Sequence, residues 1–305
     1  MIYIHVGFPK TATTFLQRDL FHKLPGIVYL GRDYARKQSY HPDIKNIIRD
    51  LCQLEEIMFD VRAYRKAFSP LIENAATEGK NLLMSDERLT LSNIFTGRHV
   101  IAKRLRELFN DQNVRIIFTI RNQIAASVSL YIYVNAILPF PVWINNKIRE
   151  QDLFKPNPLH TFLYYEVIKY YEDLFGKENI RILLQEDLKE NKNNFLEQLK
   201  DVFDIGNKDL PVSLNLSAVQ NPKQTSSARL FTKLCNLFLP SVLDSRFREC
   251  GYYRNIINML NRFGKSPQIH ISEEVMEILQ DMFKEGNNKL KKEYNLPLEK
   301  YGYPM

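Results

Sequence analysis

Short apolar runs alternate with amphipathic stretches along the first two thirds of the chain. Aliphatic and β-branched residues gather in runs of strand length: Ile2–Val6, Asn81–Ser85, Val114–Ile120, Ile180–Leu184 and, more weakly, Val28–Leu30. Between these runs, apolar side chains recur at the spacing of one helix face: over Asp60–Thr77, His99–Phe109, Gln123–Val134, His160–Phe175 and Asn194–Phe203. Strands that alternate with helices predict an α/β fold, with a parallel sheet flanked by helices on both faces.

The pattern changes after about residue 205, where strand signals stop and four turn-forming residues mark a long irregular stretch: Pro211, Asn215, Asn221 and Pro222. Three helices are predicted beyond it: Ser226–Leu239, Tyr253–Phe263 and Ser272–Lys292. We therefore expect one domain over residues 1–305, made of an α/β core (1–205) and an α-helical C-terminal extension (206–305).

Composition adds an electrostatic asymmetry. The chain has 305 residues, of which 45% are hydrophobic and 25% charged, and this excludes disordered and fibrous classes. Its net charge of +7 lies wholly in residues 1–150, which carry 21 basic and 14 acidic side chains, against 21 of each in residues 151–305. A surplus confined to one half suggests an anionic ligand there, with an ordinary basic surface as the alternative.

Cysteines and termini carry little functional signal. Cys52, Cys235 and Cys250 are too few and too scattered for a disulfide framework or a zinc cluster, and no metal site is expected. The N-terminus lacks the basic and apolar regions of a signal peptide, and no window reaches 18 apolar residues. The sequence thus predicts a cytoplasmic protein without a membrane span.

The segment Gly7–Thr14 is the first candidate site. It leaves a predicted strand and opens a helix, so that backbone N–H groups and the positive end of the helix dipole point at one spot. Lys10 adds a cation there, and three threonines, Thr11, Thr13 and Thr14, add hydroxyl donors. This chemistry predicts an anion site, and the alternative is a helix start capped by Thr13 or Thr14.

The loop differs from a Walker A motif. Counting back from Lys10, Pro9 and Ile4 stand where that motif has its two glycines. The loop is therefore shorter and stiffer than a P-loop, which disfavours a wrapped triphosphate.

The second candidate site follows the strongest predicted strand. Arg121 stands where Val114–Ile120 should end, and ligands of open parallel sheets bind beyond the carboxyl ends of strands. Ser129 comes eight residues later on the next predicted helix, whereas Ser127 faces another side of it. An Arg with a helical Ser suits a phosphate, although for an isolated Arg a surface charge is the default interpretation.

Together the two segments resemble the sulfotransferases that use 3′-phosphoadenylyl sulfate (PAPS). Gly7–Gln17 looks like the family's 5′-phosphosulfate loop, and Ile116–Asn122 with Ser129 looks like its 3′-phosphate element, in which Arg and Ser are also eight residues apart. The chain departs from the family at Gln123, where many members have Pro after Arg-Asn. The resemblance implies a P-loop-like α/β fold, in agreement with the predicted sheet.

The resemblance also implies residue roles. Lys10 would contact the phosphosulfate and stabilise the leaving oxygen, while Thr11, Ala12, Thr13 and Thr14 would hold the 5′-phosphate through hydroxyls and backbone amides. Arg121 and Ser129 would bind the 3′-phosphate. Farther along, Lys223 lies in a polar segment that either closes over the nucleotide or forms a plain surface loop.

A base must take the proton of the acceptor. The run Asn81–Ser85 ends in two carboxylates, Asp86 and Glu87, and several family members resemble this in using a Glu or His from that region. We favour Glu87, because the Ser-x-Glu spacing is similar to bacterial members. In the alternative, Asp86 only caps a helix and Glu87 lies in its first turn. His5 is a weaker candidate, since a histidine on a buried strand is more often part of the core.

These expectations predict a PAPS-dependent sulfotransferase that transfers a sulfuryl group to a hydroxyl or amine without a metal, with a carbohydrate or glycolipid as the favoured acceptor. An aromatic stretch either lines the acceptor site or belongs to the core: Tyr131, Tyr133, Phe140 and Trp143. One alternative is a P-loop-type kinase using ATP and Mg²⁺, which the missing glycines disfavour. Another is a polyanion binder, for which nucleic acid is disfavoured because only residues 103–106 form a basic cluster.

Overall fold

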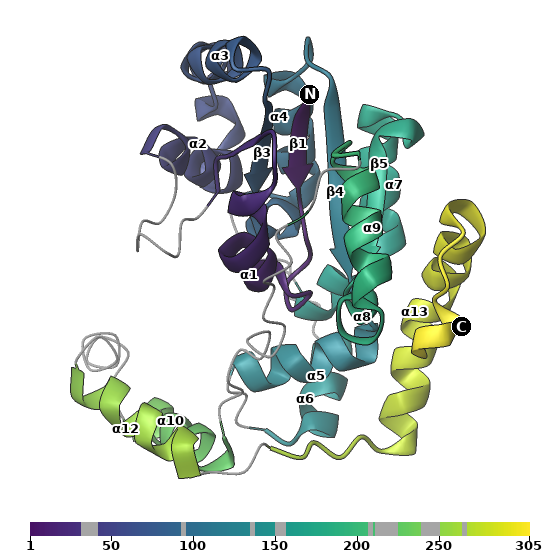
Figure 1. Cartoon of the computed structure of the whole chain (residues 1–305). Helices are drawn as coiled ribbons and strands as arrows, with labels where there is room; N and C mark the ends of the chain where they lie inside the picture. The colour runs from purple at the N-terminus through teal and green to yellow at the C-terminus, as the bar shows by residue number, and fades with distance from the viewer. Residues whose placement is uncertain are drawn as a thin grey trace.

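Five parallel strands form one sheet in the computed structural model, in the order β2-β3-β1-β4-β5 (Figure 1). The strands are β1 (Ile2–His5), β2 (Ile27–Tyr29), β3 (Asn81–Ser85), β4 (Val114–Ile120) and β5 (Ile180–Leu184). The structure describes residues 1–31, 42–92, 96–134, 138–149, 157–206, 210, 225–238, 251–263 and 267–305. All five predicted strands, including the weak one, are confirmed.

β1 lies at the centre of the sheet. His5, its last residue, lies opposite Ser85 of β3 and Ile117 of β4. The segment that leaves β1 therefore emerges between the carboxyl ends of two neighbouring strands. Both predicted site segments consequently lie at one edge of the sheet.

Side chains of each strand alternate between two cores, because successive residues of a strand point to opposite faces. Ile2 and Ile4 pack into the larger core, whereas Tyr3 between them packs into the smaller one. The helices that supply the larger core are α2 (Pro42–Gln53), α3 (Val61–Thr77), α4 (Arg98–Leu108), α5 (Gln123–Tyr133), α6 (Phe140–Arg149), α7 (Tyr164–Phe175) and α13 (Glu273–Tyr294). Those that supply the smaller core are α1 (Thr13–Phe15) with a π turn at Leu16–Leu20, α8 (Gln185–Glu190) and α9 (Lys192–Val202).

The predicted helices are confirmed in position, except that one of them is interrupted. The described residues also contain three helices that were not predicted. The expected helix His160–Phe175 is instead a 3-10 turn, Pro158–Phe162, followed by α7, since Leu163 between them has non-helical backbone angles. Asn157 caps that turn by accepting from the Leu159 amide at 2.9 Å. The three helices that the sequence pattern did not predict are α2, α6 and α8.

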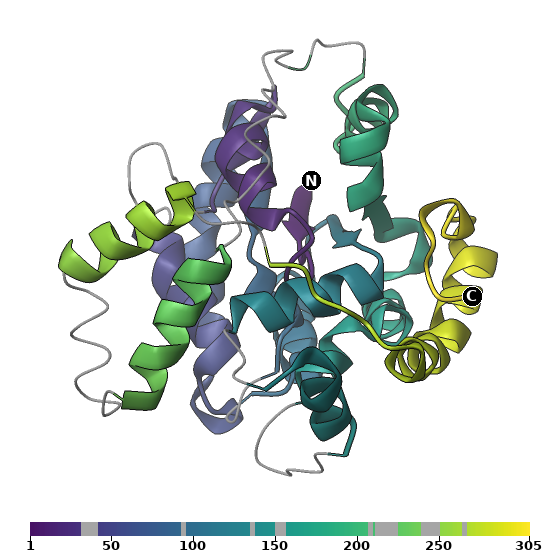
Figure 2. The ribbon, with the colours of Figure 1, turned by 90° about the horizontal axis from the view of Figure 1, so that it is seen from below.

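The C-terminal third contains α10 (Ser226–Phe238), α12 (Gly251–Phe263) and α13. Figure 2 shows α13 on one side of α5 and α6, and the pair α10–α12 on the other. Within the described ranges, no helix has the length and apolar character needed to cross a bilayer.

Candidate functional site

The two predicted anion-binding segments touch directly. The Arg121 guanidinium, at the exit of β4, donates to the backbone carbonyl of Lys10 in the loop after β1, at 3.2 Å. The neighbouring strands β1 and β4 hold this arrangement in register. One patch of the sheet edge thus carries a lysine, an arginine and the start of a helix, which suits an anion with two separated charges.

The backbone of the loop has an unusual conformation. Lys10 and Ala12 have positive φ angles of 68° and 65°, which is uncommon for residues other than glycine. Where residues in the right-handed and left-handed helical conformations alternate, successive backbone N–H groups point to one side, as in anion-binding nests. Ala12 is the N-cap of α1, so the interpretation of Thr13 or Thr14 as the cap is wrong. Because Ala12 has no capping side chain, none competes from that position for the first amides.

Two threonine hydroxyls point into the loop itself. The Thr11 hydroxyl donates to the carbonyl of Phe8, and Thr13 donates to the same oxygen at 3.4 Å. Both side chains are buried, whereas Thr14 is half-buried. In this conformation the side-chain hydroxyls of Thr11 and Thr13 shape the loop itself.

His5 is a core residue below the loop. Its Nδ1 and Nε2 each lie 2.8 Å from a hydroxyl, that of Ser85 on β3 and that of Thr119 on β4. Burial lowers the pKa of His5 from 6.5 to about 3, so the ring is neutral at physiological pH. A Cβ on Gly7 would lie only 2.6 Å from the His5 ring, so glycine is required where the loop passes over it. The structure therefore favours the core interpretation of His5.

Lys10 is half-buried and surrounded by three groups. Its Nζ lies 3.9 Å from the ring centroid of Tyr133, the last residue of α5. Burial lowers the pKa of Lys10; the nearby charge of Glu87 opposes this shift, and that of Arg121 adds to it. The structure thus brings Lys10, Glu87 and Arg121 into one electrostatic cluster.

The two candidate bases have different surroundings. Asp86 is buried, caps the short 3-10 turn Glu87–Thr90 and holds the Arg88 guanidinium with both carboxylate oxygens, the closest contact being 2.7 Å. Glu87 is exposed on the same side as Lys10. An acceptor can reach an exposed carboxylate more readily than a buried one, so the geometry favours Glu87 over Asp86.

Arg121 is held in place by residues that the sequence analysis missed. Burial lowers the pKa of the Arg121 guanidinium, and the nearby carboxylate of Glu186 opposes this shift. Tyr164, fully buried on α7, donates to the Arg121 carbonyl at 2.9 Å. Ser129, the predicted companion of Arg121, is half-buried on α5, and the Oγ of Ser127 is buried without a hydrogen-bond partner.

Glu186 connects the turn after β4 to the C-terminal tail. Its Oε1 accepts from the Asn122 amide at 2.9 Å, and its Oε2 accepts from the Tyr303 hydroxyl at 3.0 Å. The side chain of Asn122 also donates to the carbonyl of Gly302 at 2.6 Å. One available signal was that Glu186 follows Ile180–Leu184, the strand that ends at this same edge of the sheet.

The departure from the family pattern has a structural use. Gln123, where many members have Pro, is buried and exchanges two hydrogen bonds with Asn287 of α13, at 2.6 and 3.1 Å. Asn287 also donates to the Pro304 carbonyl at 2.8 Å. A proline has no side-chain amide to make these bonds, so Gln123 joins the start of α5 to the end of the chain.

The remaining predictions have mixed outcomes. Lys223 lies outside the described residues. Tyr131, Phe140 and Trp143 pack against one another as core, whereas Tyr133 is exposed. Among the residues that the structure describes, no group of three His, Cys, Asp or Glu side chains is placed to hold a metal ion.

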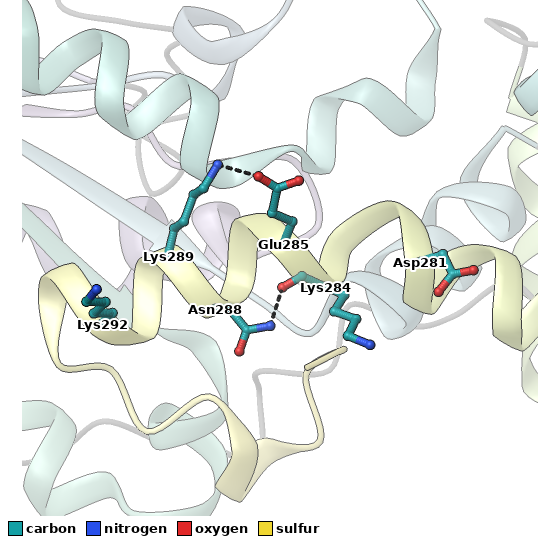
Figure 3. Close-up of a pocket in the computed structure, with 6 residues that line it drawn as sticks. All are labelled: Asp281, Lys284, Glu285, Asn288, Lys289 and Lys292. Carbon is teal, nitrogen blue, oxygen red and sulfur yellow. Dashed lines mark hydrogen bonds and ion pairs between the residues drawn. The ribbon is translucent and has the colours of Figure 1, made fainter.

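A surface depression of about 400 Å³ lies on α13 (Figure 3). Its lining belongs to one solvent-facing side of a single helix: Asp281, Lys284, Glu285, Asn288, Lys289 and Lys292. Glu285 and Lys289 pair with each other at 2.5 Å, as oppositely charged residues four apart on a helix do. The depression contains none of the predicted site residues.

Comparisons with known proteins identify the fold and the family of the chain. In fold, the chain is similar to a sulfotransferase from Alicyclobacillus acidocaldarius, with a TM-score of 0.51 and 15% identity over 98% of this chain and 97% of that chain. A mouse sulfotransferase complexed with PAP gives a TM-score of 0.44 and 12% identity over 94% of this chain and 84% of that chain. No curated protein sequence gives a match. The model of the sulfotransferase domain matches residues 3–237, most of the sequence, and the chain belongs to the sulfotransferase family.

Proposed function

We propose that the protein transfers a sulfuryl group from PAPS to an acceptor hydroxyl or amine. The hydrogen bond between Arg121 and the Lys10 carbonyl carries this proposal, because it joins the two anion-binding segments at one sheet edge. PAPS has two such anionic ends, a 5′-phosphosulfate and a 3′-phosphate. Lys10 with the amides of residues 11–14 serves the first end, and Arg121 with Ser129 serves the second.

The reaction is an in-line displacement at sulfur. The acceptor oxygen forms a bond to sulfur while the bond from sulfur to the bridging oxygen of the 5′-phosphate breaks, and adenosine 3′,5′-bisphosphate leaves. Lys10 stabilises the negative charge that develops on the leaving oxygen, and Glu87 takes the acceptor proton. Preorganised positive groups are the main catalytic contribution to such a transfer, since no covalent intermediate is required.

The acceptor is proposed to be a carbohydrate or glycolipid. Tyr133 supports this choice, because its exposed ring lies beside Lys10 and offers a flat surface on which an apolar sugar face can pack. Glu87 is also exposed near Lys10.

The test measures release of adenosine 3′,5′-bisphosphate from PAPS with a panel of glycans and glycolipids. Lys10→Ala and Arg121→Ala should each lower turnover at least about 10²-fold, since each removes a stabilising cation. Lys103→Ala removes an exposed lysine of α4 and serves as the matched control with unchanged turnover. Normal turnover in both site variants would overturn the assignment.

A second measurement tests which nucleotide the protein binds. Adenosine 3′,5′-bisphosphate should raise the melting temperature more than ATP with Mg²⁺ does; the opposite order would favour a kinase.

Glu87→Gln should lower turnover about 10²- to 10⁴-fold and leave nucleotide binding unchanged, as expected for loss of a base. Full turnover in Glu87→Gln would remove Glu87 from the mechanism.

A further inference from the structure

α10 and α12 form a hairpin beside α5 and α6, at the lower left of Figure 1. The two helices run antiparallel: the Thr225 amide, just before α10, donates to Asn261 near the end of α12 at 3.0 Å. The hydroxyl of Thr232, midway along α10, lies 3.1 Å from that of Tyr253, near the start of α12. Each helix therefore buries one stripe against the other.

Each helix also exposes large apolar side chains on another stripe. On α10, Leu230 and Leu234 are 59% and 44% exposed, and they lie one turn apart on the same side of the helix. On α12, Tyr252 and Met259 are 79% and 53% exposed and lie two turns apart. Leu230 and Leu234 thus form an apolar pair on one side of α10, and contiguous exposed apolar surface is a mark of binding sites.

The hairpin is also basic. The sequences of α10 and α12 contain four basic residues and no Asp or Glu: Arg229, Lys233, Arg254 and Arg262. Arg229 is buried against α5, whereas Lys233 is half-buried and Arg262 is exposed. Exposed apolar residues combined with basic ones and no acidic ones are typical of helices that lie at an anionic lipid surface.

The hairpin is attached next to the proposed site. Arg229 donates to the Tyr131 carbonyl at 3.4 Å, and its guanidinium lies 4.3 Å from the Tyr131 ring centroid. Tyr131 is two residues before Tyr133, whose ring contacts the Lys10 ammonium. Further exposed apolar residues lie at the end of α5 and around α6: Val134, Leu138 and Val142. The apolar surface of the hairpin is therefore anchored within one helical turn of the residue that covers Lys10.

We infer that the α10–α12 hairpin docks on an anionic lipid bilayer. Leu230, Leu234, Tyr252 and Met259 enter the boundary between headgroups and acyl chains, and the exposed Arg262 contacts lipid phosphates. Docking in this way brings the Lys10 loop close to the bilayer surface. The docking itself does not depend on sulfuryl transfer.

The experiment is co-sedimentation of the full chain with vesicles, with no nucleotide present. Phosphatidylcholine vesicles that contain phosphatidylglycerol should bind the protein, and pure phosphatidylcholine vesicles should bind it much more weakly. Leu230→Gln and Leu234→Gln should each weaken partitioning about tenfold, because each removes a buried aliphatic side chain from the lipid. Arg262→Gln should weaken it about fivefold, as expected for one basic residue at an anionic surface.

Matched controls lie elsewhere on the surface. Ile57→Gln removes an apolar residue that is exposed on the 3-10 turn Glu56–Met58, and Lys103→Gln removes an exposed lysine; neither should change partitioning. Equal binding to both vesicle types, or unchanged binding of the two leucine variants, would overturn the inference. So would a dimer of the wild-type chain that the leucine variants dissociate, since a second copy would then cover the face. Because no donor is present, failure here leaves the proposed reaction untouched.

Discussion

The loop after β1 and the turn after β4 present cations at the same sheet edge, yet they are held in different ways. The first is stabilised by near neighbours in sequence, since Thr11 and Thr13 both donate to the carbonyl of Phe8. The second is stabilised by the far end of the chain: Asn122 donates to Gly302, 180 residues away, and Gln123 pairs with Asn287, 164 residues away. The two halves of the proposed nucleotide site therefore depend on different parts of the sequence.

This difference has a consequence for stability and function. The β1 loop takes its shape from hydrogen bonds within the loop and from the strands beneath it, and its printed contacts beyond them go to Arg121 and Tyr133 rather than to α13 or the tail. The β4 turn needs α13 and the tail to be docked. Changes in α13 should therefore weaken the proposed contact of Arg121 with the 3′-phosphate, while the Lys10 loop keeps its shape.

Acid titration of His5 gives the largest expected effect on the β1 side. The unfolded chain takes up a proton on this histidine below pH 6.5, whereas the folded chain takes it up only near pH 3, where burial has placed the pKa. The stability that neutral His5 provides is therefore complete above pH 6.5 and is lost as the pH falls toward 3. The free energy of unfolding should fall by up to about 1.4 kcal/mol for each pH unit in that window.

Urea unfolding across this pH range measures the slope, and His5→Gln should flatten it. His22→Gln is the matched control, because His22 is exposed and its loss should leave the slope unchanged. If the wild-type chain and His5→Gln lose stability in parallel as the pH falls, the histidine is not the titrating group.

Gly7→Ala is the next largest change on the same side. The added Cβ would lie 2.6 Å from the His5 ring and 3.2 Å from the Thr13 hydroxyl, so the loop must shift. We expect a loss of about 1–3 kcal/mol in the free energy of unfolding, the usual cost of overpacking. The control is Gly286→Ala on α13, whose Cβ would meet its nearest neighbour at an ordinary 3.4 Å. Equal stability of the two variants in urea melts would show that the loop has room above His5.

The β1 side was largely predictable from the sequence. The strand, the tight loop and the cationic Lys10 are adjacent in the chain, so their local pattern contains the information. Even there, the sequence did not reveal that Ala12 would cap α1 or that the hydroxyls of Thr11 and Thr13 would turn inward. Those details depend on left-handed backbone angles at non-glycine residues, which are uncommon and have no composition signal.

The β4 side was predictable only in part. Arg121 was singled out because it follows the strongest strand, but the groups that surround it come from α7, α8 and the tail. Hydrogen bonds between residues more than a hundred positions apart leave no periodic pattern in a single sequence. Gln123 was noticed as a departure from the family, and only the fold shows that it binds Asn287.

The pair Gln123–Asn287 gives the smallest effect and tests the β4 side directly. Gln123→Ala leaves the Asn287 amide buried with fewer partners, and we expect it to cost about 1 kcal/mol or more in the free energy of unfolding. Asn287→Ala should cost a similar amount, and the double variant should recover at least about 0.5 kcal/mol of the summed losses. Asn288→Ala, on the exposed side of α13, is the control with little change.

The Gln123→Ala and Asn287→Ala variants should also bind adenosine 3′,5′-bisphosphate severalfold more weakly, because Arg121 is two residues from the lost contact. Simple additivity in urea melts, with unchanged nucleotide affinity, would show that the C-terminal helix does not hold the β4 turn in place.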